Sequence, residues 1–255
     1  MISVTRLSVT AVKGTRLRSV DSISLGPDGA AGDRRFYLID ELGQMISGTR
    51  LGALVSVVAD VGDNRLTLTF PDGREVEDAA SLGEPVETRF FSDTRVARLV
   101  DGPWSELLSE VAGQPVRLVQ ADGGAVAVDR GPTGAVTLIS RGSLERLSAE
   151  ANVPGVDARR FRMLIEVDGV EAHGEDAWIG RSVRIGEAQV AFGGNVGRCA
   201  FTTRDPETGQ VDLKTLHLLR QYRGEVTTTE PLPFGIYGSV VDPGVVRLGD
   251  RVTPE

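Results

Sequence analysis

The chain has 255 residues, 40% of them hydrophobic, so it is long and apolar enough to bury a core and is not predicted to be disordered. Its 36 acidic and 28 basic residues give a net charge of −8, which disfavours non-specific binding to nucleic acid or to anionic membranes. The single cysteine excludes an internal disulfide, a multi-cysteine zinc site and an iron–sulfur cluster.

The first residues, 1–7, alternate in polarity like a strand and lack the apolar core of a signal peptide. No stretch of the chain is long and apolar enough to cross a bilayer. We therefore expect a cytoplasmic protein with no membrane partner and no nucleic-acid partner.

Many short strands are expected, because glycine is frequent (31 residues) and the apolar runs are brief and rich in valine. This pattern predicts a mainly β fold. In chain order the predicted strands cover residues 2–12, 36–40, 54–60, 65–70, 96–99, 162–167, 182–185, 188–192 and 245–248. Turns are predicted at Pro71-Asp72-Gly73, Asp168-Gly169 and Pro243-Gly244.

Two or three helices interrupt the strands. The first is expected to begin with Asp101 as its N-cap and to end at Gly113, with Pro103 in its first turn and four apolar residues on its buried face: Trp104, Leu107, Leu108 and Val111. The second is predicted over residues 142–152, with Leu144 and Leu147 inward and Pro154 beyond its end.

A third helix is predicted over residues 213–222, where Leu216 and Leu219 share a face. These helices are too few for βαβ repetition, so a doubly wound sheet is not expected. The dense strand pattern gives way to a helix near residue 95, which predicts two closely packed regions, residues 1–95 and 96–255. Residues 121–134 contain four glycines and are predicted to form a long loop of the kind that is often functional.

Cys199 follows three glycines and Arg198, and Thr202 and Thr203 come shortly after it. A guanidinium next to a thiol favours the thiolate, the form that binds metals and attacks electrophiles. The glycines allow a bulky ligand to approach the backbone, and the threonines offer it hydroxyls and amides. From these residues alone, Cys199 is a buried structural cysteine, a nucleophile, or one soft ligand of a metal held mostly by other groups.

Common catalytic signatures are missing, since the sequence has no P-loop, no Gly-x-Gly-x-x-Gly and no Gly-x-Ser-x-Gly. Its two histidines, His173 and His217, are far apart and do not form the pair that would bind one metal from a helix. His173 is therefore expected to be a surface or loop residue.

Two arginine clusters lie next to predicted strands. Arg34 and Arg35 form one, and residues 159, 160 and 162 supply the other. Arginine binds phosphate in two-point geometry, so clusters that converge with Lys13 on one pocket would hold a phosphorylated cofactor. The alternative is that these arginines are solvated strand ends.

Taken together, these motifs resemble the MOSC (molybdenum cofactor sulfurase C-terminal) family, in the branch of the mitochondrial amidoxime-reducing component and its bacterial relatives. In the second region the resemblance is carried by Arg160-Phe161-Arg162, Glu175-Asp176-x-Trp178 and Arg198-Cys199-x-x-Thr202-Thr203-x-Asp205-Pro206-x-Thr208-Gly209. In the first region it is carried by Val12-Lys13-Gly14, Gly32-Asp33-Arg34-Arg35-Phe36 and residues 40–50.

The resemblance implies a MOSC-type β-barrel packed against an N-terminal β-barrel region, with the pyranopterin molybdenum cofactor bound between them. Cys199 is then the catalytic residue and the protein ligand of molybdenum, whose other soft ligands are the dithiolene sulfurs of the cofactor. The implied cofactor-binding residues are Lys13, Arg34, Arg35, Arg50, Arg160, Arg162, Arg198, Thr202 and Thr203. Asp205 and Pro206 are expected to shape the turn after the site.

The sequence departs from the eukaryotic members of this family at three places. Val196 stands where they often have a second cysteine, Met163 and Leu164 stand where they commonly have proline and asparagine, and the usual aromatic residue near His173 is replaced. These changes affect the expected substrate more than the expected cofactor.

The resemblance implies a molybdenum oxidoreductase that reduces N-hydroxylated or N-oxide-type small molecules by oxygen-atom transfer. Electrons would come from a separate reductase, a flavin, haem or iron–sulfur protein. Pyridoxal phosphate binding is a further property expected at the level of the family. Two alternatives are a sulfur-transfer module that carries a persulfide on Cys199 and a non-catalytic barrel that binds a small molecule.

Overall fold

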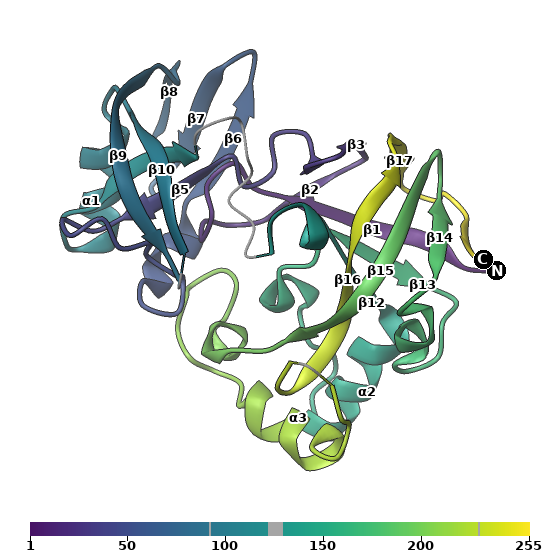
Figure 1. Ribbon diagram of the computed structural model, residues 1–255. Helices are drawn as coiled ribbons and strands as arrows, with labels where there is room; N and C mark the ends of the chain where they lie inside the picture. The colour runs from purple at the N-terminus through teal and green to yellow at the C-terminus, as the bar shows by residue number, and fades with distance from the viewer. Residues whose placement is uncertain (92, 122–129, 229) are drawn as a thin grey trace.

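A computed structural model describes residues 1–91, 93–121, 130–228 and 230–255. Within these ranges the fold is mainly β, as predicted, and consists of four sheets and three α-helices (Figure 1). No helix of the described residues is long and apolar enough to span a membrane.

The largest sheet has eight strands in the order β18-β14-β15-β16-β12-β13-β1-β2. All neighbours are antiparallel except β12 and β13, which are parallel. One face of this sheet packs on a core that includes Leu7, Leu138 and Ile165. The strands are β1 (Ser3–Val9), β2 (Arg18–Val20), β12 (Val136–Ser140), β13 (Ile165–Asp168), β14 (Ser182–Ile185), β15 (Ala188–Gly197), β16 (Pro233–Asp242) and β18 (Val252–Pro254).

Three smaller sheets complete the described fold. A four-stranded sheet has the order β5-β11-β10-β9, and two three-stranded sheets have the orders β6-β7-β8 and β17-β3-β4. Strands β5 to β10 gather at one end of the molecule with α1 (Figure 1). The bounds are β3 (Ser22–Gly26), β4 (Gly29–Ala30), β5 (Phe36–Ile39), β6 (Val58–Gly62), β7 (Arg65–Thr69), β8 (Glu75–Ala79), β9 (Leu82–Phe90), β10 (Asp93–Val100), β11 (Arg117–Ala121) and β17 (Gly244–Arg247).

The two predicted regions share sheets. Strand β1, from the N-terminal region, lies in the eight-stranded sheet beside β13, with Leu7 opposite Ile165. Strand β10 spans the predicted division at residue 95 and pairs on either side with β9 and β11. The chain therefore crosses between the two ends of the molecule more than once.

The three helices agree with their predicted positions, apart from one cap. Helix α1 (Trp104–Ala112) ends at Gly113, whose φ is 67°, but its N-cap is Pro103. The prediction that Asp101 caps this helix is wrong, because Pro103 already has a helical backbone and the Asp101 amide bonds to the carbonyl oxygen of Ser81.

Helix α2 (Arg141–Ala151) begins after Ser140, whose hydroxyl accepts a hydrogen bond from the amide of Ser143. Leu144 and Leu147 are buried, as predicted. Helix α3 (Thr215–Arg223) buries Leu219. The α2 helix contacts β12, β13 and α3, so these two helices cover part of the outer face of the eight-stranded sheet.

Two predicted strands begin later than expected. Residues 52–56 form a short 3₁₀ turn, η1 (Gly52–Ser56), and β6 starts only at Val58. Arg162 has a left-handed backbone with a φ of 54°, so β13 starts at Ile165. Of the predicted loop at 121–134, residues 122–129 lie outside the described residues, and its end forms η3 (Gly131–Gly134).

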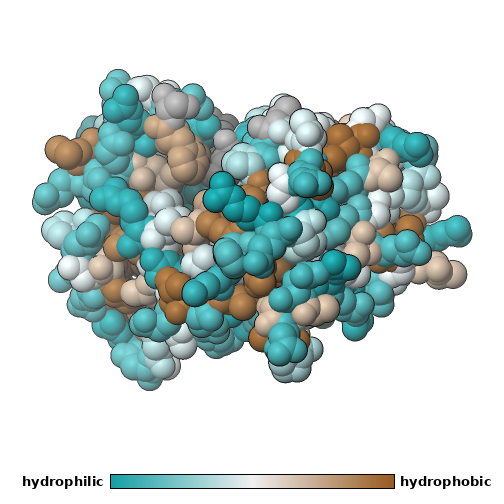
Figure 2. Space-filling view, turned by 90° about the horizontal axis from the view of Figure 1, so that it is seen from below, coloured by the Kyte–Doolittle hydropathy of each residue, from teal (hydrophilic) through white to brown (hydrophobic). Residues whose placement is uncertain are grey.

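Apolar surface is divided into small groups on the face shown in Figure 2, where hydrophobic residues alternate with hydrophilic ones. Among the exposed apolar side chains are Leu42, Phe91, Val96 and Val211. Isolated residues of this kind are normal on soluble domains.

Candidate functional site

Cys199 lies at the end of the longest strand pair of the large sheet. Strand β15 ends at Gly197, and Cys199 has an extended backbone and precedes the 3₁₀ turn η6 (Ala200–Thr203). The residue is exposed and its thiol is free. The structure therefore excludes the interpretation that Cys199 is a buried structural cysteine.

Arg198, by contrast, points into the interior. Its Nε donates to the carbonyl oxygen of Phe234 at 2.8 Å, its Nη1 to that of Phe161 at 2.9 Å, and its Nη2 to Met163 Sδ at 3.0 Å. Burial lowers the pKa of Arg198 to about 9, and the neighbouring Cys199 opposes this shift. Arg198 is therefore still a cation at neutral pH and holds the backbone behind the thiol in place.

A segment from the N-terminal region packs directly on the Cys199 loop. Thr49 Oγ1 lies 3.8 Å from Cys199 Sγ. The Arg204 guanidinium donates to the carbonyl oxygen of Thr49 at 2.8 Å and to that of Gly209 at 2.7 Å. A Cβ on Gly48 would lie only 2.1 Å from the Phe201 ring, so any other residue at this position would force the ring to move.

Arg34 and Arg162 belong to the same cluster. Arg34 forms an ion pair with Asp33, and its Nη2 donates to the carbonyl oxygen of Arg162 at 2.7 Å. The Arg162 guanidinium lies 5.2 Å from the centre of the Phe201 ring. Through Phe201 the two arginines are thus connected to the loop that carries Cys199.

Lys13 lies beside the start of β5. Its amide donates to the carbonyl oxygen of Phe36 at 2.8 Å, and its ammonium lies 5.6 Å from the centre of the Phe90 ring. It therefore comes from the same part of the fold as Arg34, whose amide bonds to the carbonyl oxygen of Thr10.

Two other candidate arginines, Arg35 and Arg160, are bound by groups of the protein itself. Arg35 donates to Gln120 at 2.8 Å and to Asn64 at 2.7 Å. Arg160 is buried and donates to Asp212 at 2.6 Å and to the carbonyl oxygen of Arg204, at the end of η6, at 2.7 Å. Arg35 thus belongs to the scaffold, whereas Arg160 holds the end of the turn that follows Cys199.

The remaining candidates lie at or near the same loop. Arg50 is largely exposed, 3.6 Å from Asp40. Thr202 donates to the Cys199 carbonyl oxygen at 3.1 Å and shares a hydrogen bond with Thr215, while Thr203 donates to the Ala200 carbonyl oxygen. The threonine hydroxyls thus hold the η6 turn.

The turn after η6 is shaped by Asp205, as expected. Its Oδ1 accepts hydrogen bonds from the amides of Glu207 and Thr208 at 3.0 Å and 2.7 Å. Glu207 itself is held between Arg16 at 3.1 Å and Arg159 at 2.7 Å. Because Arg16 comes from the N-terminal region, these two ion pairs of Glu207 join the two regions next to the site.

His173 lies in a turn, as expected, but it is half-buried rather than on the surface. Its ring packs against Tyr222 and Phe234, with ring centres 5.7 Å and 5.8 Å away. Burial, followed by the charges of Arg223 and Arg146, lowers the pKa of His173 to about 4. The half-buried side chain is therefore neutral at physiological pH.

Sequence reasoning missed Thr49 and Arg204, which link the N-terminal region to the Cys199 loop. Their contact spans 155 positions, and no local pattern identifies such a pair. The available signal was glycine: Gly48 and Gly52 lie in the segment that approaches the loop. In the described ranges, no three His, Cys, Asp or Glu side chains cluster as a metal site.

Comparison with known proteins gives two family matches. The model of the MOSC domain matches residues 126–253, and that of the MOSC N-terminal beta barrel domain matches residues 1–109. The chain is 30% identical to mitochondrial amidoxime-reducing component 1 of Danio rerio, over 98% of this chain and 83% of that protein. It is 27% identical to the Xenopus laevis protein of the same name, over 98% of this chain and 81% of that protein.

A longer protein also resembles this chain. Molybdenum cofactor sulfurase of Anopheles gambiae is 26% identical over 85% of the chain, which corresponds to 31% of the length of that sulfurase.

Proposed function

The chain belongs to the MOSC domain family, and on that premise we propose that it binds the molybdenum cofactor and reduces N-hydroxylated or N-oxide-type small molecules. The observation that carries this proposal is the exposed, free thiol of Cys199 on a loop that residues of both regions enclose. Relatives of similar length are named amidoxime-reducing components, which supports the proposed reaction class.

The residues around Cys199 fit such a cofactor. A thiolate is a soft ligand suited to a metal that also binds sulfur from the cofactor. Arg34 and Arg162 supply cations for an anionic phosphate, as would Lys13 from the same N-terminal region as Arg34, and the Phe201 ring offers an apolar surface. Arg34 and Arg162 lie in turns with left-handed backbones, at φ of 47° and 54°.

The departure at Met163 and Leu164 is compatible with this fit. Met163 Sδ accepts a hydrogen bond from Arg198, and Leu164 is buried in the sheet core. Met163 therefore supports the loop from behind and Leu164 belongs to the core of the large sheet, so we propose no cofactor contact for either side chain.

Each residue then has a defined task. Cys199 would hold molybdenum, while Arg198 keeps the loop in position through its hydrogen bonds to the carbonyl oxygens of Phe234 and Phe161. Arg34, Arg162 and Lys13 would bind the phosphate and pterin. When bound, the cofactor supplies the two-electron chemistry that removes oxygen from the substrate nitrogen. We propose that the electrons come from a separate reductase, a flavin, haem or iron–sulfur protein.

The test uses the full chain purified from a host that makes the cofactor. We expect it to contain molybdenum and to reduce benzamidoxime with reduced methyl viologen as electron donor. Cys199→Ala should lose this reduction, whereas Thr253→Ala, a change at an exposed residue of the edge strand β18, should retain most of it. Wild-type protein without molybdenum would refute the proposal.

Sulfur transfer is a second candidate, because the thiol is exposed and a sulfurase is among the relatives. In this reaction the Cys199 thiolate would attack the outer sulfur of a desulfurase persulfide, gain that sulfur, and release the desulfurase thiolate. Mass spectrometry after incubation with a cysteine desulfurase and cysteine would detect one added sulfur on Cys199. A persulfide on molybdenum-free protein would favour this function.

A further inference from the structure

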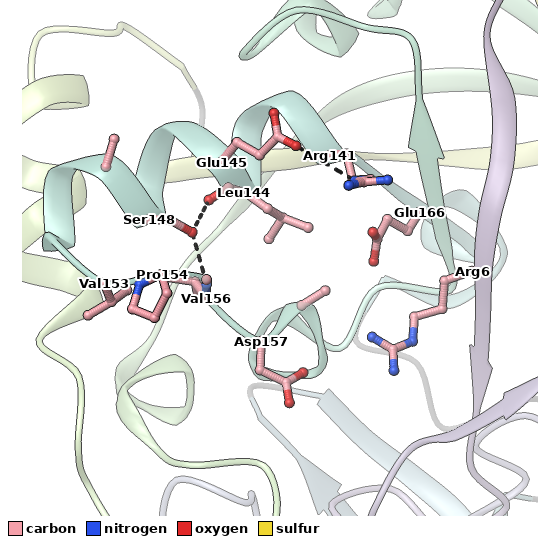
Figure 3. Close-up of a pocket in the computed structure, with 13 residues that line it drawn as sticks. Arg6, Arg141, Leu144, Glu145, Ser148, Val153, Pro154, Val156, Asp157 and Glu166 are labelled. Carbon is pink, nitrogen blue, oxygen red and sulfur yellow. Dashed lines mark hydrogen bonds and ion pairs between the residues drawn. The ribbon is translucent and has the colours of Figure 1, made fainter.

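A cavity of about 720 Å³ lies between α2, residues 153–158, β13 and β1 (Figure 3). Its volume is in the range of small-molecule sites. None of the residues implied in cofactor binding lines it. The cavity is therefore separate from the site described above.

One wall of the cavity is fixed by hydrogen bonds. The Ser148 hydroxyl donates to the Leu144 carbonyl oxygen at 2.8 Å and accepts from the Val156 amide at 2.9 Å (Figure 3). The Val153 amide also bonds to the Ser148 carbonyl oxygen. These bonds hold the loop against α2, so this wall is formed before any ligand arrives.

This wall is apolar. Leu144, Pro154 and Val156 line it, and the Leu144 side chain projects from the helix toward the cavity (Figure 3). It offers van der Waals contact to an aliphatic group.

The opposite wall carries a carboxylate and a guanidinium from paired strands. Glu166 of β13 lies directly opposite Arg6 of β1, so the two side chains share one face of the sheet (Figure 3). On its other side, β13 pairs with β12, where Glu166 lies opposite Ile139. The Ile139 side chain packs with residues of α2 and α3.

These two groups have few partners among the described residues. The Glu166 carboxylate accepts no hydrogen bond there and lies beyond ion-pair distance of Arg6, and Arg6 uses only its Nε, to Ser19 Oγ at 3.3 Å. Burial of Glu166 raises its pKa, although Arg6 and Arg141 oppose this shift.

The other charged groups of the cavity are already paired. Asp157 accepts from Arg159 at 2.6 Å, and Arg141 lies 3.4 Å from Asp168 and 3.7 Å from Glu145. Glu166 and Arg6 are thus the groups with hydrogen-bonding capacity left for a ligand.

We propose that this cavity binds a small zwitterion with an apolar body, of the chemical class of a free aliphatic α-amino acid. Its ammonium group would bind the Glu166 carboxylate, its carboxylate would bind the Arg6 guanidinium, and its side chain would contact Leu144 and Pro154. A ligand with one charge would leave the opposite protein group without a partner, which is costly in a half-buried site.

The experiment measures the binding of L-leucine to the full chain by isothermal titration calorimetry, beside two analogues. 4-Methylpentanoate lacks the ammonium group, and 3-methylbutylamine lacks the carboxylate. We expect saturable binding of leucine at one site and binding of each analogue that is weaker by about tenfold or more, since each loses one charge-assisted hydrogen bond.

Two variants assign the contacts. Glu166→Gln and Arg6→Gln should each weaken leucine binding by about tenfold, while Glu166→Gln should scarcely change binding of 4-methylpentanoate and Arg6→Gln should scarcely change that of 3-methylbutylamine. The matched control is Glu145→Gln, at an exposed carboxylate that lines the same cavity, and it should leave leucine binding within about twofold.

Absence of saturable leucine binding by the wild-type chain overturns the proposal, as does leucine binding that neither Glu166→Gln nor Arg6→Gln weakens. If a variant does not fold, judged by its thermal melting, the analogues decide on the wild-type protein: equal binding of leucine and both analogues also overturns it. Because the cavity is separate from Cys199, these outcomes do not depend on molybdenum.

Discussion

Arg34 and Arg35 are adjacent in the chain but face different surroundings. Arg34 bonds to the Arg162 backbone near the Cys199 loop, whereas Arg35 bonds to Gln120. If the proposed cofactor site is correct, Arg34→Ala should lower the molybdenum content of the purified protein by about tenfold, because a cation beside the bound anion is lost.

Arg35→Ala is the control for that change and should keep near wild-type molybdenum content. Metal analysis of both variants, purified in the same way, checks the prediction. An equal loss of molybdenum in the two variants would contradict the proposal that Arg34 binds the cofactor.

His173 makes the stability of the fold depend on pH. Its pKa is lowered to about 4 in the folded protein, from an ordinary value of 6.5, by burial and then by nearby arginines. Between these values the unfolded chain binds more protons than the folded one, so the free energy of unfolding should fall as the pH drops through this window.

His173→Asn removes the titrating group and suits the left-handed backbone at this position, where φ is 61°. Urea unfolding at about pH 7 and about pH 5 should therefore show a smaller pH dependence for this variant than for the wild type. The same dependence in both proteins would show that other groups cause the change.

The segment of residues 47–52 and the loop after Cys199 approach each other through glycine. Gly209 has a φ of 72°, and a Cβ there would lie 2.1 Å from the Gly52 carbonyl oxygen. Gly209→Ala should therefore destabilise the fold by more than the roughly 1–2 kcal/mol that a left-handed backbone costs an alanine.

Gly180→Ala measures the cost of the left-handed backbone alone, because Gly180 has a φ of 81° and open space where its Cβ would be. The comparison of the two variants in thermal melting measures the cost of the close approach. Equal melting temperatures would show that the loop and the segment separate easily.

Among the strands, those with regular alternation of aliphatic and polar residues were predictable. The prediction of 182–185 is confirmed by β14, and that of 65–70 largely by β7. Strand β16 was missed because it begins with Pro233 and contains two glycines. Strand β8 was missed because its sequence is polar, and four of its five residues are exposed.

Residues 54–60 were predicted as a strand because they are apolar, yet the first part forms η1, which contacts α1. Leu54 and Val55 are buried there by tertiary packing and not by strand pairing. Periodicity cannot distinguish these two causes of burial.

At the candidate site, sequence motifs identified both arginine clusters but could not decide what each arginine contacts. The reason is that Arg34 and Arg162 both have left-handed backbones, with φ of 47° and 54°, which redirect the side chains. Strand alternation does not continue through such turns.

At the scale of the whole molecule, the two regions share β-sheets. Strands β1, β2 and β3 of the N-terminal region complete sheets of the C-terminal region, and the Arg16–Glu207 ion pair joins them beside the site. A fragment of residues 96–255 would expose the edge of β13 and part of the core around Ile165.

We predict that this fragment has no cooperative thermal unfolding transition, whereas the full chain has one. Circular dichroism during heating of both proteins provides the measurement. A cooperative transition of the isolated fragment would show that the C-terminal region folds independently.

The proposed role of Cys199 as the protein ligand of molybdenum is tested most directly by X-ray absorption at the molybdenum edge. The cofactor-loaded wild-type chain should show one more sulfur ligand than Cys199→Ala loaded in the same way. The same number of sulfur ligands in both proteins would contradict the account.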